Sequence, residues 1–140
     1  MPVQAGFDII PLQKDEYKVV LPKQHVLAQK ESVDIKELEN EPFLLLEHGG
    51  RTEVTQLLEK SGVHPQIRFT TWEDYAIMAM AEKGLGIGIL PQLILRRIPY
   101  QVELRSLAQP YYREIVLAVK NKKRVSVVTQ KFFDYLKYRE

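Results

Sequence analysis

Two short segments of this sequence carry groups that could bind a small molecule. The first segment joins an apolar run of strand length to a predicted helix and consists of His48, Gly49, Gly50, Arg51 and Thr52. Backbone amides at a helix N-terminus attract anions, and paired glycines allow a ligand to approach closely. Arg51 could add a charge-assisted hydrogen bond to a carboxylate. A solvated turn explains the same residues equally well, so both interpretations stay open.

The second segment also lies where a predicted strand ends and a helix begins, and it contains Thr70, Thr71 and Trp72. Ligands of open α/β sheets bind outside the carboxyl ends of the strands, so these hydroxyls and this indole lie where they could contact a ligand. The spacing of Thr71 and Asp74 also predicts a capping box, and Trp72 could simply pack. We expect the capping role, and a ligand contact stays open beside it because the same groups can serve both purposes.

Other motifs that could carry chemistry fail on spacing or context. The run from Gly84 to Gly88 lacks the spacing of a dinucleotide fingerprint, and it closes a helix instead of opening one. There is no cysteine, and the three histidines are scattered without a second ligand at metal-binding spacing. The carboxylate pairs Asp15–Glu16 and Glu73–Asp74 are explained by a turn and a helix cap. We therefore expect no metal, no cofactor and no enzymatic activity.

The composition of the 140 residues is that of a folded domain, with 45% hydrophobic and 27% charged residues. A net charge of +2 is too small to indicate nucleic-acid binding, and the basic run Lys120–Arg124 is typical of a solvated loop. The N-terminus has no signal-peptide pattern, and no window approaches the ~20 continuous apolar residues that span a bilayer. We expect a cytoplasmic location.

Apolar runs with turn signals between them predict alternating strands and helices. The expected strands are 7–12, 17–21, 42–46, 67–71, 85–90, 102–107 and 114–119, and the expected helices are 51–60, 71–83, 92–97 and 125–138. A further helical turn is expected at Asp34–Leu38, and Gly62 and Gly84 are expected to end helices. This order predicts an α/β fold with a mostly parallel sheet covered on both faces.

Several of these segments, taken in order, resemble the effector-binding domain of LysR-type transcriptional regulators. The segments that carry the resemblance are Phe7–Leu12, Asp15–Ala28, Leu38–Leu46, Ala81–Pro91, Ile115–Lys120 and Val125–Tyr138. The resemblance implies a type II fold like that of periplasmic binding proteins, in which a small effector is held between two lobes. It also implies that DNA is read by a helix-turn-helix domain, which this sequence lacks together with most of the first lobe.

The resemblance further implies a division of the chain. Residues 1–16 correspond to a remnant of the first lobe, 17–22 to a crossing strand, 23–113 to a complete second lobe, and 114–140 to the return strand and final helix. It places effector contacts near Thr70, Thr71 and Trp72, and near Ile87 and Ile89, with Val19 and Leu21 of the crossing strand as further candidates.

The final helix is expected to lack the lobe on which it would normally pack. Its apolar residues Phe132, Phe133, Tyr135 and Leu136 would then form a face that favours a homo-oligomer or a rearranged packing of the helix. We therefore predict the effector-sensing domain of a regulator, binding a small and anionic metabolite, with no membrane contact. A solute-binding module of a transport system is the alternative with the same fold, and a small enzyme is the weaker rival.

Overall fold

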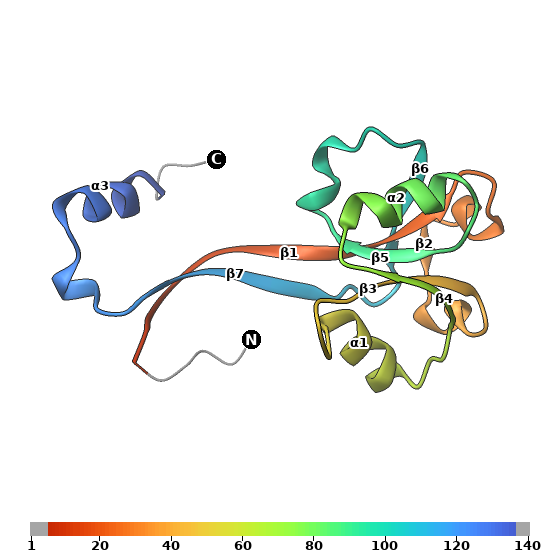
Figure 1. The fold of residues 1–140 in the computed structure, drawn as a ribbon, viewed down its shortest axis with the longest axis horizontal. Coiled ribbons are helices and arrows are strands. Elements are labelled where there is room, and N and C mark those ends of the chain that lie inside the picture. The colour runs from red at the N-terminus through yellow and green to blue at the C-terminus, as the bar shows by residue number, and fades with distance from the viewer. Residues whose placement is uncertain (1–5, 137–140) are drawn as a thin grey trace. The chain divides into compact units, whose positions relative to one another are not determined.

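The computed structural model describes residues 6–136, and these form two compact units (Figure 1). One unit is continuous and runs from Asp15 to Arg113. The other combines the chain before Asp15 with the chain after Arg113. Within the described residues, no helix is both long and apolar enough to cross a membrane.

The continuous unit is built around a mixed sheet. Its strands are β1 (Asp8–Pro22), which begins in the other unit, β2 (Ser32–Val33), β3 (Pro42–Leu46), β4 (Gln66–Thr71), β5 (Gly88–Pro91) and β6 (Val102–Leu107). Hydrogen bonding gives the order β2-β6-β1-β5, and β3 pairs with β4. A parallel bridge between Phe43 and Ile87 joins the two groups of strands. Because β5 and β6 both pair antiparallel with β1 whereas the other pairs are parallel, only β1 runs against this set. The α/β class is thus confirmed, but the expected mostly parallel sheet is a mixed one, because the central strand β1 pairs antiparallel with both of its neighbours.

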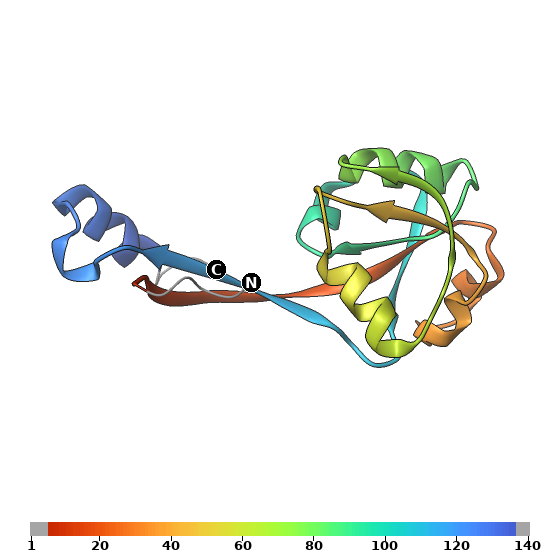
Figure 2. The same ribbon diagram turned by 60° about the horizontal axis from the view of Figure 1, so that its bottom comes forward.

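The helices α1 (Glu53–Ser61) and α2 (Asp74–Glu82) lie on opposite sides of the β3–β4 pair (Figures 1 and 2). They bury β3, whereas Ile67 and Phe69 of β4 stay exposed. Three short 3₁₀ helices, η1 (Val26–Gln29), η2 (Ile35–Leu38) and η3 (Ile94–Arg97), complete the unit. Gly62 and Gly84 adopt positive φ where α1 and α2 end, and Asp34 caps η2, as expected from the sequence.

Two core clusters lie on the two faces of the sheet, because successive side chains of a strand point to opposite faces. Val19 and Leu21 of β1 pack in the cluster that contains Val54 and Leu58 of α1. Val20, between them, packs in the cluster that contains Ile77 and other residues of α2. The central strands are therefore buried on both faces, as the unbroken apolar runs of the sequence predict.

The sequence predicts two strands before Pro22, separated by a polar turn at residues 13–16, and this prediction is wrong. The chain forms one strand of 15 residues, β1. Within it Asp15, Tyr17, Val19 and Leu21 are all buried, so the period of two extends back through the supposed turn. A charged residue continues the strand here because its carboxylate has an ion-pair partner, which is described below.

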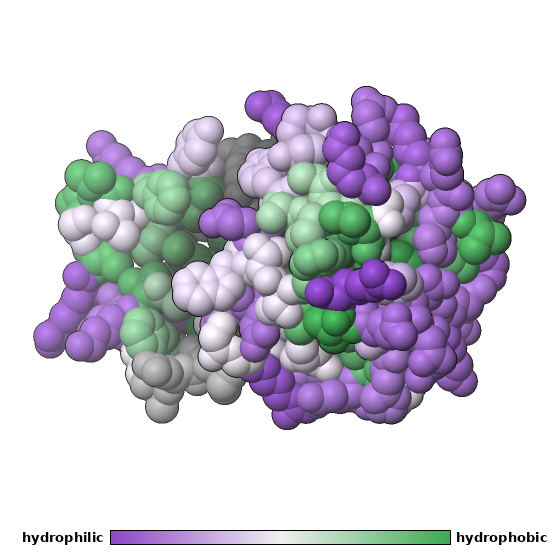
Figure 3. Space-filling view, turned by 45° about the vertical axis from the view of Figure 1, so that its right-hand side comes forward, coloured by the Kyte–Doolittle hydropathy of each residue, from purple (hydrophilic) through white to green (hydrophobic). Residues whose placement is uncertain are grey.

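The other unit contains the first part of β1, most of β7 (Tyr112–Val119), η4 (Lys122–Arg124) and α3 (Val127–Leu136). β7 pairs with β1. Of the four residues predicted to form an apolar face on α3, Phe133 is buried, whereas Phe132 and Tyr135 are 52% and 69% exposed. In the space-filling view, hydrophobic residues gather where α3 lies (Figure 3).

Candidate functional site

The structure brings the two candidate binding segments together at one end of the sheet. β3 and β4 are parallel neighbours, and Leu46 pairs with Thr71 at the carboxyl end of both strands. The Glu47 N–H donates to the Thr71 carbonyl over 3.0 Å, so the turns that follow the two strands begin side by side. We call the residues Glu47–Glu53 and Thr70–Asp74 the strand-end corner.

The first half of the corner is organised by the cap of α1. Thr52 is the N-cap residue: its backbone N–H donates to Thr55 Oγ1 over 2.8 Å, and its side-chain oxygen accepts from the Thr55 N–H over 3.3 Å. The helix therefore begins at Glu53, two residues after the predicted start. Gly49 and Gly50 precede the cap with φ of 75° and 154°, which residues with a Cβ rarely adopt.

The predicted anion site requires an unpaired Arg51, but the structure pairs this residue with a carboxylate. Its guanidinium forms an ion pair with Glu59, two turns along α1 from the cap, and both side chains are more than half exposed. Exposed ion pairs of this kind contribute only ~0–1 kcal/mol, so a ligand carboxylate could compete for the guanidinium.

The predicted capping box at the start of α2 is wrong. Glu73 is the N-cap residue and its side chain makes no capping bond. Thr71 Oγ1 instead accepts from the Glu73 N–H over 3.2 Å and so closes a small turn before the helix. Thr71 thus shapes the corner without capping α2, and Asp74 is left without the role that the spacing suggested.

Asp74 carries the one buried side-chain oxygen that lacks a hydrogen-bond partner within the described residues, Oδ1. Burial raises the pKa of this carboxyl above its ordinary value, while the nearby His48 and Arg113 act in the opposite direction. His48 belongs to the turn after β3, so its charge acts on Asp74 from the other half of the corner.

Trp72 and Thr70 extend into solvent at the corner. The indole of Trp72 is 70% exposed, and Trp72 is the single tryptophan of the sequence. An exposed indole beside threonine hydroxyls is a surface on which a ligand can stack and form hydrogen bonds.

Sequence analysis missed a set of polar residues that border the corner. The Tyr17 hydroxyl donates to the carboxylate of Glu53, the first residue of α1, and burial together with this contact raises the pKa of the Tyr17 phenol. The Tyr17 ring also contacts that of Tyr111 with centroids 5.6 Å apart. The alternation that buries Tyr17 in β1 was readable in the sequence, but neither partner could be identified from it.

Asp15 is a second residue whose role the sequence did not reveal, because the run of polar residues around it predicted a turn. Its carboxylate is nearly fully buried, and Oδ2 accepts from both Nε and Nη2 of Arg113 over 2.9 Å. Oδ1 accepts from the Leu93 N–H over 3.0 Å. Since Asp15 and Arg113 are the first and last residues of the continuous unit, this pair joins the two places where the chain enters and leaves it.

Four residues proposed as effector contacts lie elsewhere. Val19, Leu21, Ile87 and Ile89 are at most 2% exposed and pack in the core cluster on the α1 face. Their side chains form part of the hydrophobic core that packs against the sheet, and a direct contact between them and a ligand stays a prediction. Among the described residues no group of histidine and acidic side chains is arranged to hold a metal ion.

Comparisons with known proteins agree on one family. A family model described as "LysR substrate binding domain" matches residues 2–139. An uncharacterized HTH-type transcriptional regulator of Bacillus subtilis, YvbU, is 28% identical over 132 residues, which is 93% of this chain and 45% of the relative. Another regulator of the same organism, YwqM, is 38% identical over 97 residues, covering 67% of this chain and 32% of the relative. The chain thus spans less than half the length of these relatives.

Solved structures share the fold. The CcmR regulatory domain of Synechocystis PCC6803 in complex with 2-PG superposes with a TM-score of 0.86 at 27% identity, covering 97% of this chain and 68% of that one. The effector-binding domain of QuiR in complex with shikimate gives a TM-score of 0.81 at 25% identity, covering 99% and 68%. The type II α/β fold expected from the sequence is therefore confirmed.

Proposed function

The chain belongs to the family of LysR substrate-binding domains, and from that premise we propose that it senses a small-molecule effector for a DNA-binding transcription regulator. The observation that carries the proposal is the strand-end corner, where the turns after β3 and β4 meet and place Trp72 in solvent. Relatives that are transcription regulators favour this role over transport and over catalysis.

We propose that the effector is a small metabolite with an anionic group. The Gly49–Thr52 backbone leads into the N-terminus of α1, where amide groups and the helix dipole favour negative charge. Related domains have been solved with 2-PG and with shikimate. In this arrangement Thr70, Thr71 and Trp72 would contact the body of the effector, and Arg51 would exchange Glu59 for the effector's anionic group.

We further propose that the unit from Asp15 to Arg113 corresponds to the second lobe of a two-lobed sensor. Residues 17–22 would then be the crossing strand, and residues 114–140 the return strand and final helix of the first lobe. DNA contact would belong to a helix-turn-helix domain, and the exposed residues of α3 to a homo-oligomer. A ligand would act by favouring one of two pre-existing arrangements of such a sensor.

Fluorescence of Trp72 tests the effector site directly, because no other tryptophan contributes to the signal. The 140-residue chain is titrated with shikimate and other small organic acids, and its melting temperature is measured in parallel. We expect one class of acid to change the emission saturably and to raise the melting temperature, since a ligand that binds only the folded state stabilises it.

Two variants make the test specific to the corner. Thr71→Val removes a hydroxyl from the corner and should weaken binding about three- to tenfold, the effect of one hydrogen bond. Thr129→Val, an equivalent change on α3, should leave the affinity unchanged. Saturable binding that leaves Trp72 emission unchanged, or that is insensitive to Thr71→Val, would contradict the proposed site.

A further inference from the structure

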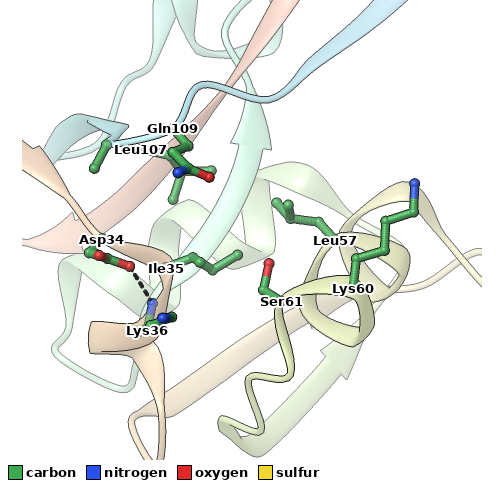
Figure 4. Close-up of a pocket in the computed structure, with 9 residues that line it drawn as sticks. Asp34, Ile35, Lys36, Leu57, Lys60, Ser61, Leu107 and Gln109 are labelled. Atoms are coloured by element: carbon green, nitrogen blue, oxygen red, sulfur yellow. Dashed lines mark hydrogen bonds between the residues drawn. The ribbon is translucent and has the colours of Figure 1, made fainter.

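A hollow in the unit Asp15–Arg113 lies away from the strand-end corner, at the other end of α1. Its volume is about 400 Å³, within the range of roughly 300–1,000 Å³ that is typical of small-molecule sites. It is formed by η2, by the last turn of α1 and by the segment that follows β6 (Figure 4). None of the residues considered for the effector site lines it.

The inner wall of the hollow is apolar. Leu107 is 2% exposed, and Ile35 and Leu57 are partly buried against the core cluster on the α1 face. In the close-up view Ile35 and Leu57 point toward each other across the hollow (Figure 4). A ligand there would cover apolar surface that is now in contact with water, which favours a molecule with an apolar body.

The rim is polar and carries a positive balance of charge. The Ser61 hydroxyl points into the space between the apolar walls (Figure 4). The side chains of Ser61, Gln109, Lys36 and Lys60 form no hydrogen bond or ion pair with any other part of the described chain. Asp34 is engaged, because its carboxylate accepts from the Lys36 N–H over 2.9 Å. Two ammonium groups against one carboxylate leave the rim with one net positive charge.

We infer that this hollow is a second ligand site, which takes a small organic acid with an apolar body and a single negative charge. The apolar body lies between Ile35, Leu57 and Leu107. The carboxylate faces the rim, where the Ser61 hydroxyl and the Gln109 amide donate hydrogen bonds and the two lysines supply the opposite charge. The site is separate from the effector corner, and it does not depend on what that corner binds.

Octanoate, octanol and octylamine form a matched set of probes, since they share an alkyl chain and differ in the charge of the head group. Each is titrated, below the concentration at which it self-associates, into the isotope-labelled 140-residue chain while backbone amide chemical shifts are recorded. We expect octanoate to cause saturable shifts at Ile35, Leu57, Ser61 and Gln109, with octanol weaker and octylamine weakest.

Variants test the charge and the cavity separately. Lys60→Gln should weaken octanoate binding about two- to fivefold, the effect of one exposed ion pair, and should leave octanol unaffected. Lys83→Gln, at the end of α2, is the matched control and should change nothing. Ser61→Phe places a ring in the hollow and should abolish binding. Ser61→Ala removes one hydrogen bond and should weaken binding without abolishing it.

The location of the shifts separates this site from the effector corner. Saturable shifts confined to Gly49–Thr52 and Thr70–Trp72 would support the corner and overturn the second site. Octanol or octylamine binding as tightly as octanoate would overturn the assignment of an organic acid. Shifts that never saturate and spread over exposed apolar residues would show non-specific adsorption, and would overturn the inference as well.

Discussion

Asp15 and Arg113 are 98 residues apart in the chain, yet they form a two-pronged ion pair in which Oδ2 of Asp15 accepts from Nε and Nη2 of Arg113. The carboxylate is buried and its other oxygen accepts from the Leu93 N–H. The pair therefore links β1, the start of β7 and the segment after β5.

We predict that Asp15→Asn lowers the free energy of unfolding by ~2–3 kcal/mol, because it leaves Arg113 without its anion in a largely buried position. The loss should be smaller than for a fully buried pair, since Arg113 still reaches water. Urea denaturation measures it. Glu103→Gln removes the anion of a more exposed pair, Arg105–Glu103, and should cost less than ~1 kcal/mol. Equal losses in the two variants would show that burial of Asp15 is unimportant.

We predict that Asp74 makes the free energy of unfolding depend on pH. Its folded-state pKa is raised by burial, so ionisation is costlier in the folded chain than in the unfolded chain. This loss of folding stability is absent when the pH lies below the ordinary aspartate pKa. It reaches its full size once the pH exceeds the raised pKa of Asp74 in the folded chain. Asp74→Asn should therefore melt at a higher temperature than the parent chain at pH 7, and the difference should vanish as the pH falls to the ordinary range.

Glu31→Gln serves as the control for that pH series, since Glu31 is an exposed carboxylate that precedes β2 and does not adjoin Asp74. This substitution should have little effect on how the free energy of unfolding varies with pH. A difference between Asp74→Asn and the parent chain that grows toward low pH would contradict the assigned direction of the shift.

Gly88 allows α2 to lie close against β5. A Cβ at this position would lie 2.5 Å from Cγ2 of Ile77, which is fully buried. We predict that Gly88→Ala costs about 1–3 kcal/mol, the usual range for overpacking a core. Ile77→Leu removes the Cγ2 methyl, so the cost of Gly88→Ala should be smaller in that background. Additive costs of the two changes in a double-mutant cycle would rule out this contact as the cause.

Thr52 holds the start of α1, and with it the geometry of the first half of the corner. Thr52→Ala should destabilise the chain by about 1 kcal/mol, since the Thr55 N–H loses its acceptor. Thr52→Ser keeps a hydroxyl and should restore most of the loss. Thermal melts of the three chains make the comparison, and a serine variant as unstable as the alanine variant would assign the effect to the lost methyl group instead.

Local patterns were enough to predict much of this fold. The run Pro42–Leu46 indicated a strand buried on both faces, and Gly62 and Gly84 indicated where two helices end, because these features depend on neighbouring residues alone. The same reasoning located both halves of the corner at strand ends. The same reasoning was wrong at Asp15. This residue lies in a run of four polar residues, 13–16, and such a run indicates a turn unless the ion-pair partner of the carboxylate is known.

Tertiary structure decided the remaining points. It placed Arg113 against Asp15, turned β1 against its neighbours, engaged Arg51 with Glu59 and left Asp74 Oδ1 without a partner. The Asp15–Arg113 pair and the direction of β1 depend on segments far apart in the chain, and residue spacing carries no information on either. Glu59 lies only eight residues from Arg51, but which charged neighbour Arg51 takes depends on how the turn before α1 folds. The sequence by itself thus determined the elements and the candidate segments, whereas packing determined which charges are paired, which stay free and which turns meet.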